Sequence, residues 1–99
     1  MLLLASTSDL LRVITAAAAD IEVYAAWVDN ASGVITPGRT CTASITTATT
    51  TTVVGSPGAS TQRNVKHMNI TNNHASASCG VTVDITDGTN PVELMSFIL

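Results

Sequence analysis

Hydrophobic and polar residues alternate along several short stretches of the chain, and the clearest of these lies near the C-terminal end. In residues 79–86, Cys, Val, Val and Ile occupy one set of alternate positions, and Gly, Thr, Asp and Thr occupy the other. Successive side chains of a β-strand point to opposite faces, so this pattern predicts a half-buried strand. We expect neighbouring strands over residues 63–71 and 92–99, which would form a three-stranded meander with it.

The N-terminal half contains two further candidate strands. Residues 10–15 follow a Ser that could cap a helix, and four alanines follow them, but the β-branched run Val-Ile-Thr favours a strand. Residues 21–28 alternate cleanly, with Ile21, Val23, Ala25 and Trp27 on one face. We interpret Trp27 as a core residue rather than a ligand platform, because an indole has a large area to bury.

Turn-forming residues divide the rest of the chain. Residues 36–40, TPGRT, have Pro and Gly at the two central positions of a type II turn, after a short strand over residues 34–36. The threonine-rich residues 41–54 end in Val-Val and predict either two edge strands or one long bent strand. Asp87-Gly88 predicts a hairpin, and Pro91 marks the start of the last strand.

These elements amount to about seven or eight short strands with a turn roughly every ten residues. The prediction is an all-β fold, an antiparallel, jelly-roll-like β-sandwich that forms a single domain over residues 1–99. The apolar start, MLLLA, is too short for a signal peptide and lacks a basic lead. We expect it to form a first strand or an anchoring segment over residues 1–8.

Composition changes the picture in one respect, the surface. Charged residues make up 11% of the chain, against about 25% in an average domain. The surface must therefore be largely neutral Thr, Ser, Asn and Ala, which suits a protein that lies against other protein. The net charge of −3 and the lack of a basic stripe disfavour nucleic acid, and no apolar run is long enough for a membrane span.

Two cysteines, Cys41 and Cys79, allow two interpretations. They are either small buried hydrophobic residues that stay reduced or the two ends of one disulfide that ties an early strand to a late one. A zinc site is not expected, since neither cysteine has a second Cys or a His at ligand spacing.

No constellation of catalytic or metal-binding residues emerges. His67 and His74 lack further ligands, and Asp84 and Asp87 lack the other oxygen ligands of a calcium loop. A glycosylation pattern over residues 69–71 falls inside a predicted strand. The chain has neither a nucleophile elbow nor a phosphate-binding loop. We therefore expect no enzyme activity and no cofactor.

Several motifs together resemble a group of small β-rich virion proteins of tailed bacteriophages. They are the opening STSDLLRVIT with DIEVYAAWVD, TPGRT at residues 36–40, the threonine run to Val-Val, STQRNV at residues 60–65, residues 69–75 and the Asp87-Gly88 hairpin. The resemblance implies a non-enzymatic component of the virion, such as a capsid decoration or cement protein, a head fibre, or part of the tail-fibre and neck apparatus.

The first functional hypothesis is a virion protein that self-associates, expected as a trimer, and binds the major capsid or neck protein. The expected contact residues are apolar chain ends and a lone basic residue. They are Leu2, Leu3, Leu4, Arg39, Phe97, Ile98 and Leu99. The alternative is a tail-fibre or neck-associated module that attaches to host carbohydrate, for which three aromatic residues are few. A secreted adhesion domain would need the signal peptide that is not found.

Overall fold

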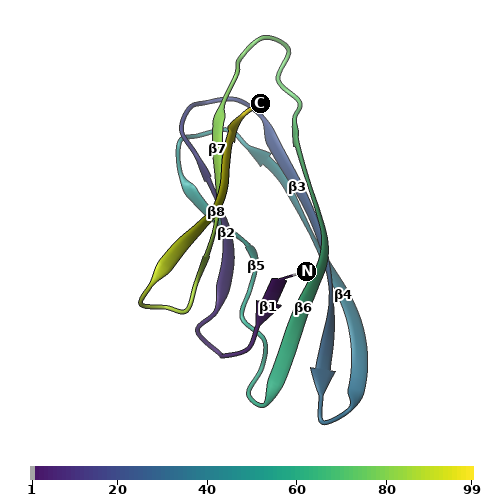
Figure 1. Cartoon of the computed structure of the whole chain (residues 1–99). Coiled ribbons are helices and arrows are strands. Elements are labelled where there is room, and N and C mark those ends of the chain that lie inside the picture. Colours follow the sequence, from purple (N-terminus) through teal and green to yellow (C-terminus); the bar gives the residue numbers. More distant parts are fainter. Residues whose placement is uncertain (1) are drawn as a thin grey trace.

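A computed structural model describes residues 2–99 as two four-stranded antiparallel sheets, which face each other in Figure 1. The first sheet has the order β1 (Leu2–Leu4), β6 (Thr61–Asn72), β3 (Ile21–Ala31) and β4 (Val34–Ile45). The second has the order β5 (Thr50–Val54), β2 (Leu10–Thr15), β7 (Gly80–Thr86) and β8 (Pro91–Ile98). No helix occurs in residues 2–99. The prediction of an all-β, sandwich-like fold is confirmed.

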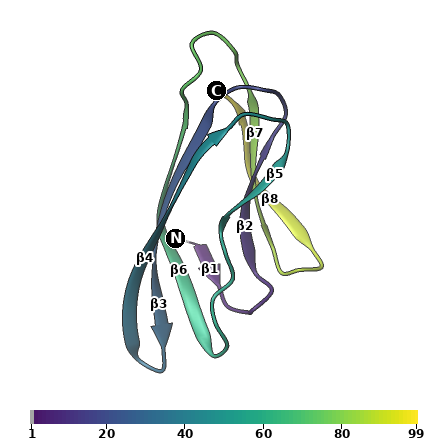
Figure 2. The same cartoon turned by 180° about the vertical axis from the view of Figure 1, so that it is seen from behind.

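One hydrophobic core lies between the sheets, and both contribute to it about equally. Its members occupy alternate positions along the inner strands, as the pleat of a half-buried strand requires. The buried hydrophobic residues are Leu4, Ile21, Val23, Ala25, Ile45 and Val65 from the first sheet, Leu11, Val13, Val53, Val54, Val81 and Val83 from the second, and Ala19 and Cys79 beside them. Figure 2 shows the same two layers from behind.

The strands with the clearest alternation lie where the sequence predicts them. The strand predicted over residues 10–15 is β2 with the same bounds, and β3 begins at Ile21 and continues to Ala31. Trp27 is partly buried and packs against the core. The threonine-rich segment forms two edge strands, one in each sheet, which confirms the first of the two alternatives for it.

The predicted meander is wrong for its first pair of strands. Strands β7 and β8 form the expected hairpin around Asp87-Gly88, but β6 pairs with β1 and β3 in the other sheet. The connection after β6 therefore crosses from one layer to the other. Alternation reveals which residues of a strand are buried, but both layers bury their side chains against the same core, so it does not reveal the layer.

The type II turn predicted over residues 36–40 is also wrong, because these residues lie inside β4. The chain reverses earlier, at Ser32 and Gly33, whose φ angles of 52° and 84° are both positive, as a tight hairpin turn requires. Strand β4 is an edge strand, and an edge tolerates Pro37 because the missing N–H can face solvent.

Gly38 lies in this strand for a steric reason. It pairs with Trp27 on β3, and a Cβ at Gly38 would come within 2.7 to 2.9 Å of three atoms of the indole. The ring itself is held from another side by Arg63, whose guanidinium carbon lies 4.6 Å from a Trp27 ring centroid. The absence of a side chain at Gly38 therefore makes room for the indole.

We predict that Gly38→Ala lowers the free energy of unfolding by about 1–3 kcal/mol, since the added methyl group overpacks the site against a constrained ring. Urea denaturation followed by tryptophan fluorescence measures the change. Gly55→Ala is the matched control, because a Cβ at Gly55 meets nothing within 4 Å. Equal stability of the two variants would contradict the steric role of Gly38.

Candidate functional site

The two sheets end in four edge strands, and three of these are poor templates for pairing with another chain. Strand β1 has only three residues, and β5 is short and its register with β2 shifts at a bulge. Strand β4 contains Pro37 and the charged Arg39. Short length, bulges, proline and charge are the usual means by which proteins prevent edge-to-edge association. Strand β8 is longer than β1 and β5. Its proline, its one charged residue and its bulge, Pro91, Glu93 and Leu94, all lie in its first half, so residues 95–98 have none of these features.

Strand β8 is also the most exposed apolar segment of the molecule. Ile98 is 79% exposed, Val92 55% and Met95 51%, while Phe97 is partly buried. Two causes contribute. Ile98 points to the outer face of the second sheet, whereas Met95 points to the inner face, which is only partly covered because β1 ends after three residues. Figures 1 and 2 show the hairpin of β7 and β8 diverging from the first sheet.

A groove lies between β8 and the nearby edge of the first sheet. Its volume is about 290 Å³, and its walls come from β1, β6, β7 and β8. The lining is mainly apolar, apart from a lysine and a histidine on β6. The lining residues are Leu2, Val65, Lys66, His67, Met68, Val83, Leu94 and Met95. The groove and β8 together form the open edge of the molecule.

The hydrogen bonds of β8 show which backbone groups face away from the sheet. Cys79 and Leu99 exchange two backbone hydrogen bonds of 2.8 and 2.9 Å, whereas the Gly80 carbonyl accepts one from Ala16 on the opposite side. Bonded and non-bonded pairs alternate along an antiparallel ladder. Cys79 and Leu99 form a bonded pair, so the pairs Gly80–Ile98 and Thr82–Ser96 are non-bonded. The N–H and C=O groups of Ser96 and Ile98 therefore point away from β7.

The end of β8 is held in place by its neighbours. The Asn72 side-chain amide at the end of β6 donates to the carbonyls of Ala77 and Leu99, at 2.8 and 3.1 Å. The Thr82 and Ser96 hydroxyls lie 3.2 Å apart on the outer face of the second sheet. The outward backbone groups of β8 are therefore ordered before any partner binds, which lowers the entropic cost of pairing.

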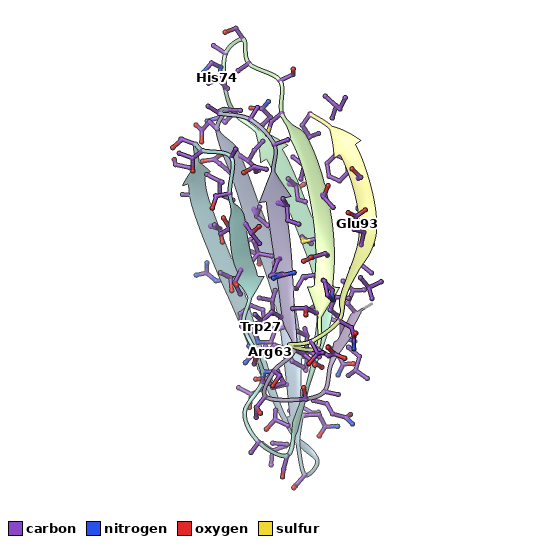
Figure 3. The ribbon with its side chains drawn as sticks, turned by 90° about the vertical axis from the view of Figure 1, so that its left-hand side faces the viewer. Trp27, Arg63, His74 and Glu93 are labelled. Atoms are coloured by element: carbon purple, nitrogen blue, oxygen red, sulfur yellow. The ribbon has the colours of Figure 1, made fainter. Side chains whose placement is uncertain are left out.

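The best-buried polar cluster of the first sheet has a structural role. Arg63 donates to both carboxylate oxygens of Asp29, at 2.8 and 3.0 Å, and to the Gly55 carbonyl at 3.0 Å, while it lies against Trp27. Figure 3 labels Arg63 and Trp27 side by side. The Arg63 guanidinium holds the pKa of Asp29 below its usual value through these hydrogen bonds. Through these three hydrogen bonds, Arg63 ties β3, β6 and the loop after β5 together.

We predict that Asp29→Asn lowers the free energy of unfolding by about 1 kcal/mol at neutral pH, as expected for a partly buried ion pair. Because folding depresses the pKa of Asp29, its stabilisation is present above the unfolded value of about 3.9 and is lost as the pH falls. The stability difference between wild type and variant, measured by urea denaturation, should therefore shrink below about pH 4. A difference that stays constant from pH 7 to pH 3 would contradict the ion-pair role.

Asp84 and Asp87, the two carboxylates considered as calcium ligands in the sequence, both have hydrogen-bond partners within the protein. Arg12 binds Asp84 across strands β2 and β7 with contacts of 2.9 and 2.6 Å. The Asp87 carboxylate accepts hydrogen bonds from the backbone N–H groups of Thr89 and Asn90, and these bonds close the hairpin turn before β8. Over residues 2–99, no group of three or more His, Cys, Asp or Glu side chains is arranged to hold a metal ion.

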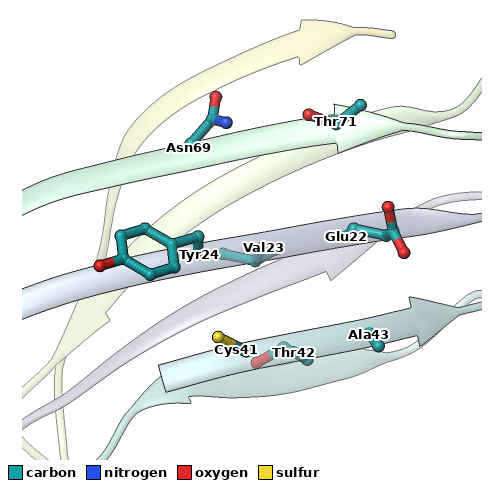
Figure 4. Close-up of a pocket in the computed structure, with 8 residues that line it drawn as sticks. All are labelled: Glu22, Val23, Tyr24, Cys41, Thr42, Ala43, Asn69 and Thr71. Carbon is teal, nitrogen blue, oxygen red and sulfur yellow. The ribbon is translucent and has the colours of Figure 1, made fainter. Parts of the chain in front are cut away.

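A shallow hollow on the outer face of the first sheet spans three neighbouring strands, β4, β3 and β6 (Figure 4). It holds Cys41, Tyr24, Glu22 and two residues of the glycosylation pattern, Asn69 and Thr71. The side chain of Arg39 donates to the Cys41 sulfur at 3.3 Å.

Cys41 is exposed there, whereas Cys79 is buried in the core, and both are free thiols. The disulfide alternative is therefore wrong, and the interpretation as a small buried residue is confirmed for Cys79 and wrong for Cys41. The two side chains occupy opposite sides of the first sheet, one against solvent and the other in the core.

The predicted contact residues are only partly brought together. Leu4 is fully buried in the core, while Leu3 is 50% exposed and Leu2 lines the groove. Arg39 lies on β4, at the far edge of the first sheet from β1. The predicted residues at the end of β8 do lie on the open edge, and sequence reasoning missed three others on the same strand. The missed residues are Val92, Leu94 and Met95. The available signal was the apolar character of residues 92–99, in which Glu93 is the only charged residue.

No helix in residues 2–99 is both long enough and apolar enough to cross a membrane. No protein-family model, no curated protein and no solved structure matches this chain.

Proposed function

We propose that this protein is a non-enzymatic structural component of a bacteriophage virion, which self-associates and binds and stabilises the capsid as a decoration, cement or head-fibre protein. The observation that carries a protein-binding role is the open edge. An apolar strand that is exposed on both faces and has free outward backbone groups is a surface for another polypeptide. The assignment to a virion rests on the resemblance of the sequence motifs to small phage proteins.

The mechanism is stabilisation by burial. A partner that covers β8 removes Val92, Met95 and Ile98 from water and pairs with the outward N–H and C=O groups of the strand. The low charge of the chain, 11%, keeps the desolvation cost of such a contact small. A jelly-roll-like connection of the strands is a further prediction of this proposal, and so is self-association. The molar mass in solution distinguishes the trimer expected from the sequence from a two-fold dimer.

The alternative, a tail-fibre or neck-associated module that attaches to host carbohydrate, has weaker support. Sugar sites rely on exposed aromatic faces, and here Arg63 lies over the Trp27 ring while Phe97 is partly buried. Tyr24 is 38% exposed and lies near the His67 ring, at 6.2 Å between centroids. One partly exposed tyrosine is a poor platform compared with the apolar length of β8.

We predict that the purified protein co-sediments with bare capsids of its phage. Ile98→Lys should weaken this binding at least about tenfold, because a charge on the edge strand opposes the pairing of β8 with another copy, and a single copy loses the avidity of an assembly that contacts the capsid at several points. Ile35→Lys is the matched control: Ile35 is 59% exposed, like Ile98 an isoleucine on an edge strand, but it lies on β4. Quantitative pelleting over a range of protein concentrations gives the affinities.

Two results would overturn this proposal. Binding to host cells but not to capsids would favour the alternative function. Loss of capsid binding in Ile35→Lys, with Ile98→Lys unaffected, would move the contact surface from β8 to β4.

A further inference from the structure

We infer that the occupant of the open edge is a second copy of this chain, and that two β8 strands pair antiparallel about a two-fold axis. The two four-stranded second sheets would then form one continuous sheet across the dimer. This inference deepens the proposed self-association and rests on it, by naming the strand, the symmetry and the register of the contact.

The backbone restricts the registers that two β8 strands can adopt. Only residues whose N–H and C=O groups face outward can bond across the new interface, and these include Ser96 and Ile98. Outward residues must therefore lie opposite outward residues. The register shift between Val83 and Asp84 leaves Leu94 as a bulge in β8, so the regular ladder covers residues 95–99.

One register uses the whole of this regular segment, the one centred on Phe97. It places Ser96 opposite Ile98 of the other copy, and Ile98 opposite Ser96, so that each pair exchanges both backbone hydrogen bonds. A register centred on Ser96 would instead place Ile98 opposite the bulge at Leu94. A register centred on Ile98 would shorten the shared segment.

Side chains agree with the register centred on Phe97. On the inner face, Phe97 meets Phe97 of the second copy and Met95 meets Leu99, so every contact is apolar. The two Phe97 Cα atoms would lie about 4.5 Å apart, as in a non-hydrogen-bonded pair, where an aromatic pair adds stability. Glu93 lies outside residues 95–99, so no side-chain carboxylate is buried and no like-charged side chains meet.

Two features favour a second copy over a ring of three copies. Residues 95–99 are complementary to themselves, which is the requirement for a two-fold contact, and such a contact closes with two copies. A three-fold ring needs β8 to meet a different edge. The other long edge, β4, contains Pro37 and Arg39, which oppose strand pairing.

The first test is the molar mass in solution, by light scattering after size-exclusion chromatography. The expected result is a dimer for wild type and for Ile35→Lys, and a monomer, or a dimer weakened at least about tenfold, for Met95→Lys, since a lysine there faces Leu99 of the partner. Ser96→Pro is a second variant: it removes an outward N–H, so the fold should persist while the dimer is lost. Circular dichroism verifies that each variant is folded.

The second test measures the register by cross-linking, in a Cys41→Ser background that removes the exposed thiol. Ser96→Cys in one copy and Ile98→Cys in the other would have Cα atoms about 5.5 Å apart, within disulfide range. In a dimer in which both copies carry Ser96→Cys, the two substituted residues would be diagonal neighbours, with their Cα atoms about 7–8 Å apart. The two variants are given different tags and mixed. The yield of disulfide-linked heterodimer should be at least about tenfold higher than the yield of linked homodimer from either variant alone. Ser76→Cys, in the exposed loop before β7, mixed with Ile98→Cys is the control.

A trimer or a monomer in the first test would overturn the inference, as would self-linking of Ser96→Cys in preference to the mixed pair. These failures are separable from failure of the proposed function. A monomer that still pellets with capsids removes the two-fold contact alone, whereas a cross-linked dimer that ignores capsids removes the virion role alone.

Discussion

A β-sheet is stable in water only if something covers its apolar face, and in this protein the two sheets cover each other unequally. The core is closed where β2 and β7 lie over β3 and β6. On one side the first sheet ends in β1, which has three residues, while the second sheet ends in β8, which has eight. This difference in length leaves part of the inner face of β8 without a facing strand, and the groove and the exposure of Met95 follow from it.

The polar interactions of the chain maintain this shape and do not compete with the open edge. Arg63 joins β3 to β6 through Asp29, and Arg12 joins β2 to β7 through Asp84, so each sheet has one ion pair between two of its inner strands. Asn72 connects the end of β6 to Leu99 at the end of β8. These contacts fix the relative positions of the strands that line the groove. They leave the outward side of β8 free of charged partners.

Local pattern predicted the strands and failed wherever a long-range partner decides the outcome. Strands β2, β3 and β7 were found because alternation depends only on the strand itself. The sheet to which β6 belongs was not predicted, because strands of both sheets bury alternate side chains in the same core. Asp84 was assigned to the exposed face of its strand, yet it is 3% exposed, because Arg12 lies opposite it across the sheet and satisfies its charge. The TPGRT segment looks like a turn in isolation, but pairing with β3 makes it a strand, and Gly38 leaves room there for the Trp27 ring.

The same limit applies to the open edge. An apolar chain end was a sufficient signal for Phe97, Ile98 and Leu99, but whether a hydrophobic residue is buried or offered to a partner depends on what faces it. Leu4 and Met95 have similar character, and one is in the core while the other is half exposed, because Leu4 faces the second sheet and nothing covers Met95. The one charged residue of β8, Glu93, lies before the bulge at Leu94, so no charged side chain protects residues 95–99 against pairing. Strands β1, β4 and β5 are instead protected by brevity, proline or a bulge, and the regular, uncharged residues at the end of β8 have none of these, so pairing with another strand is the remaining way to keep them out of water.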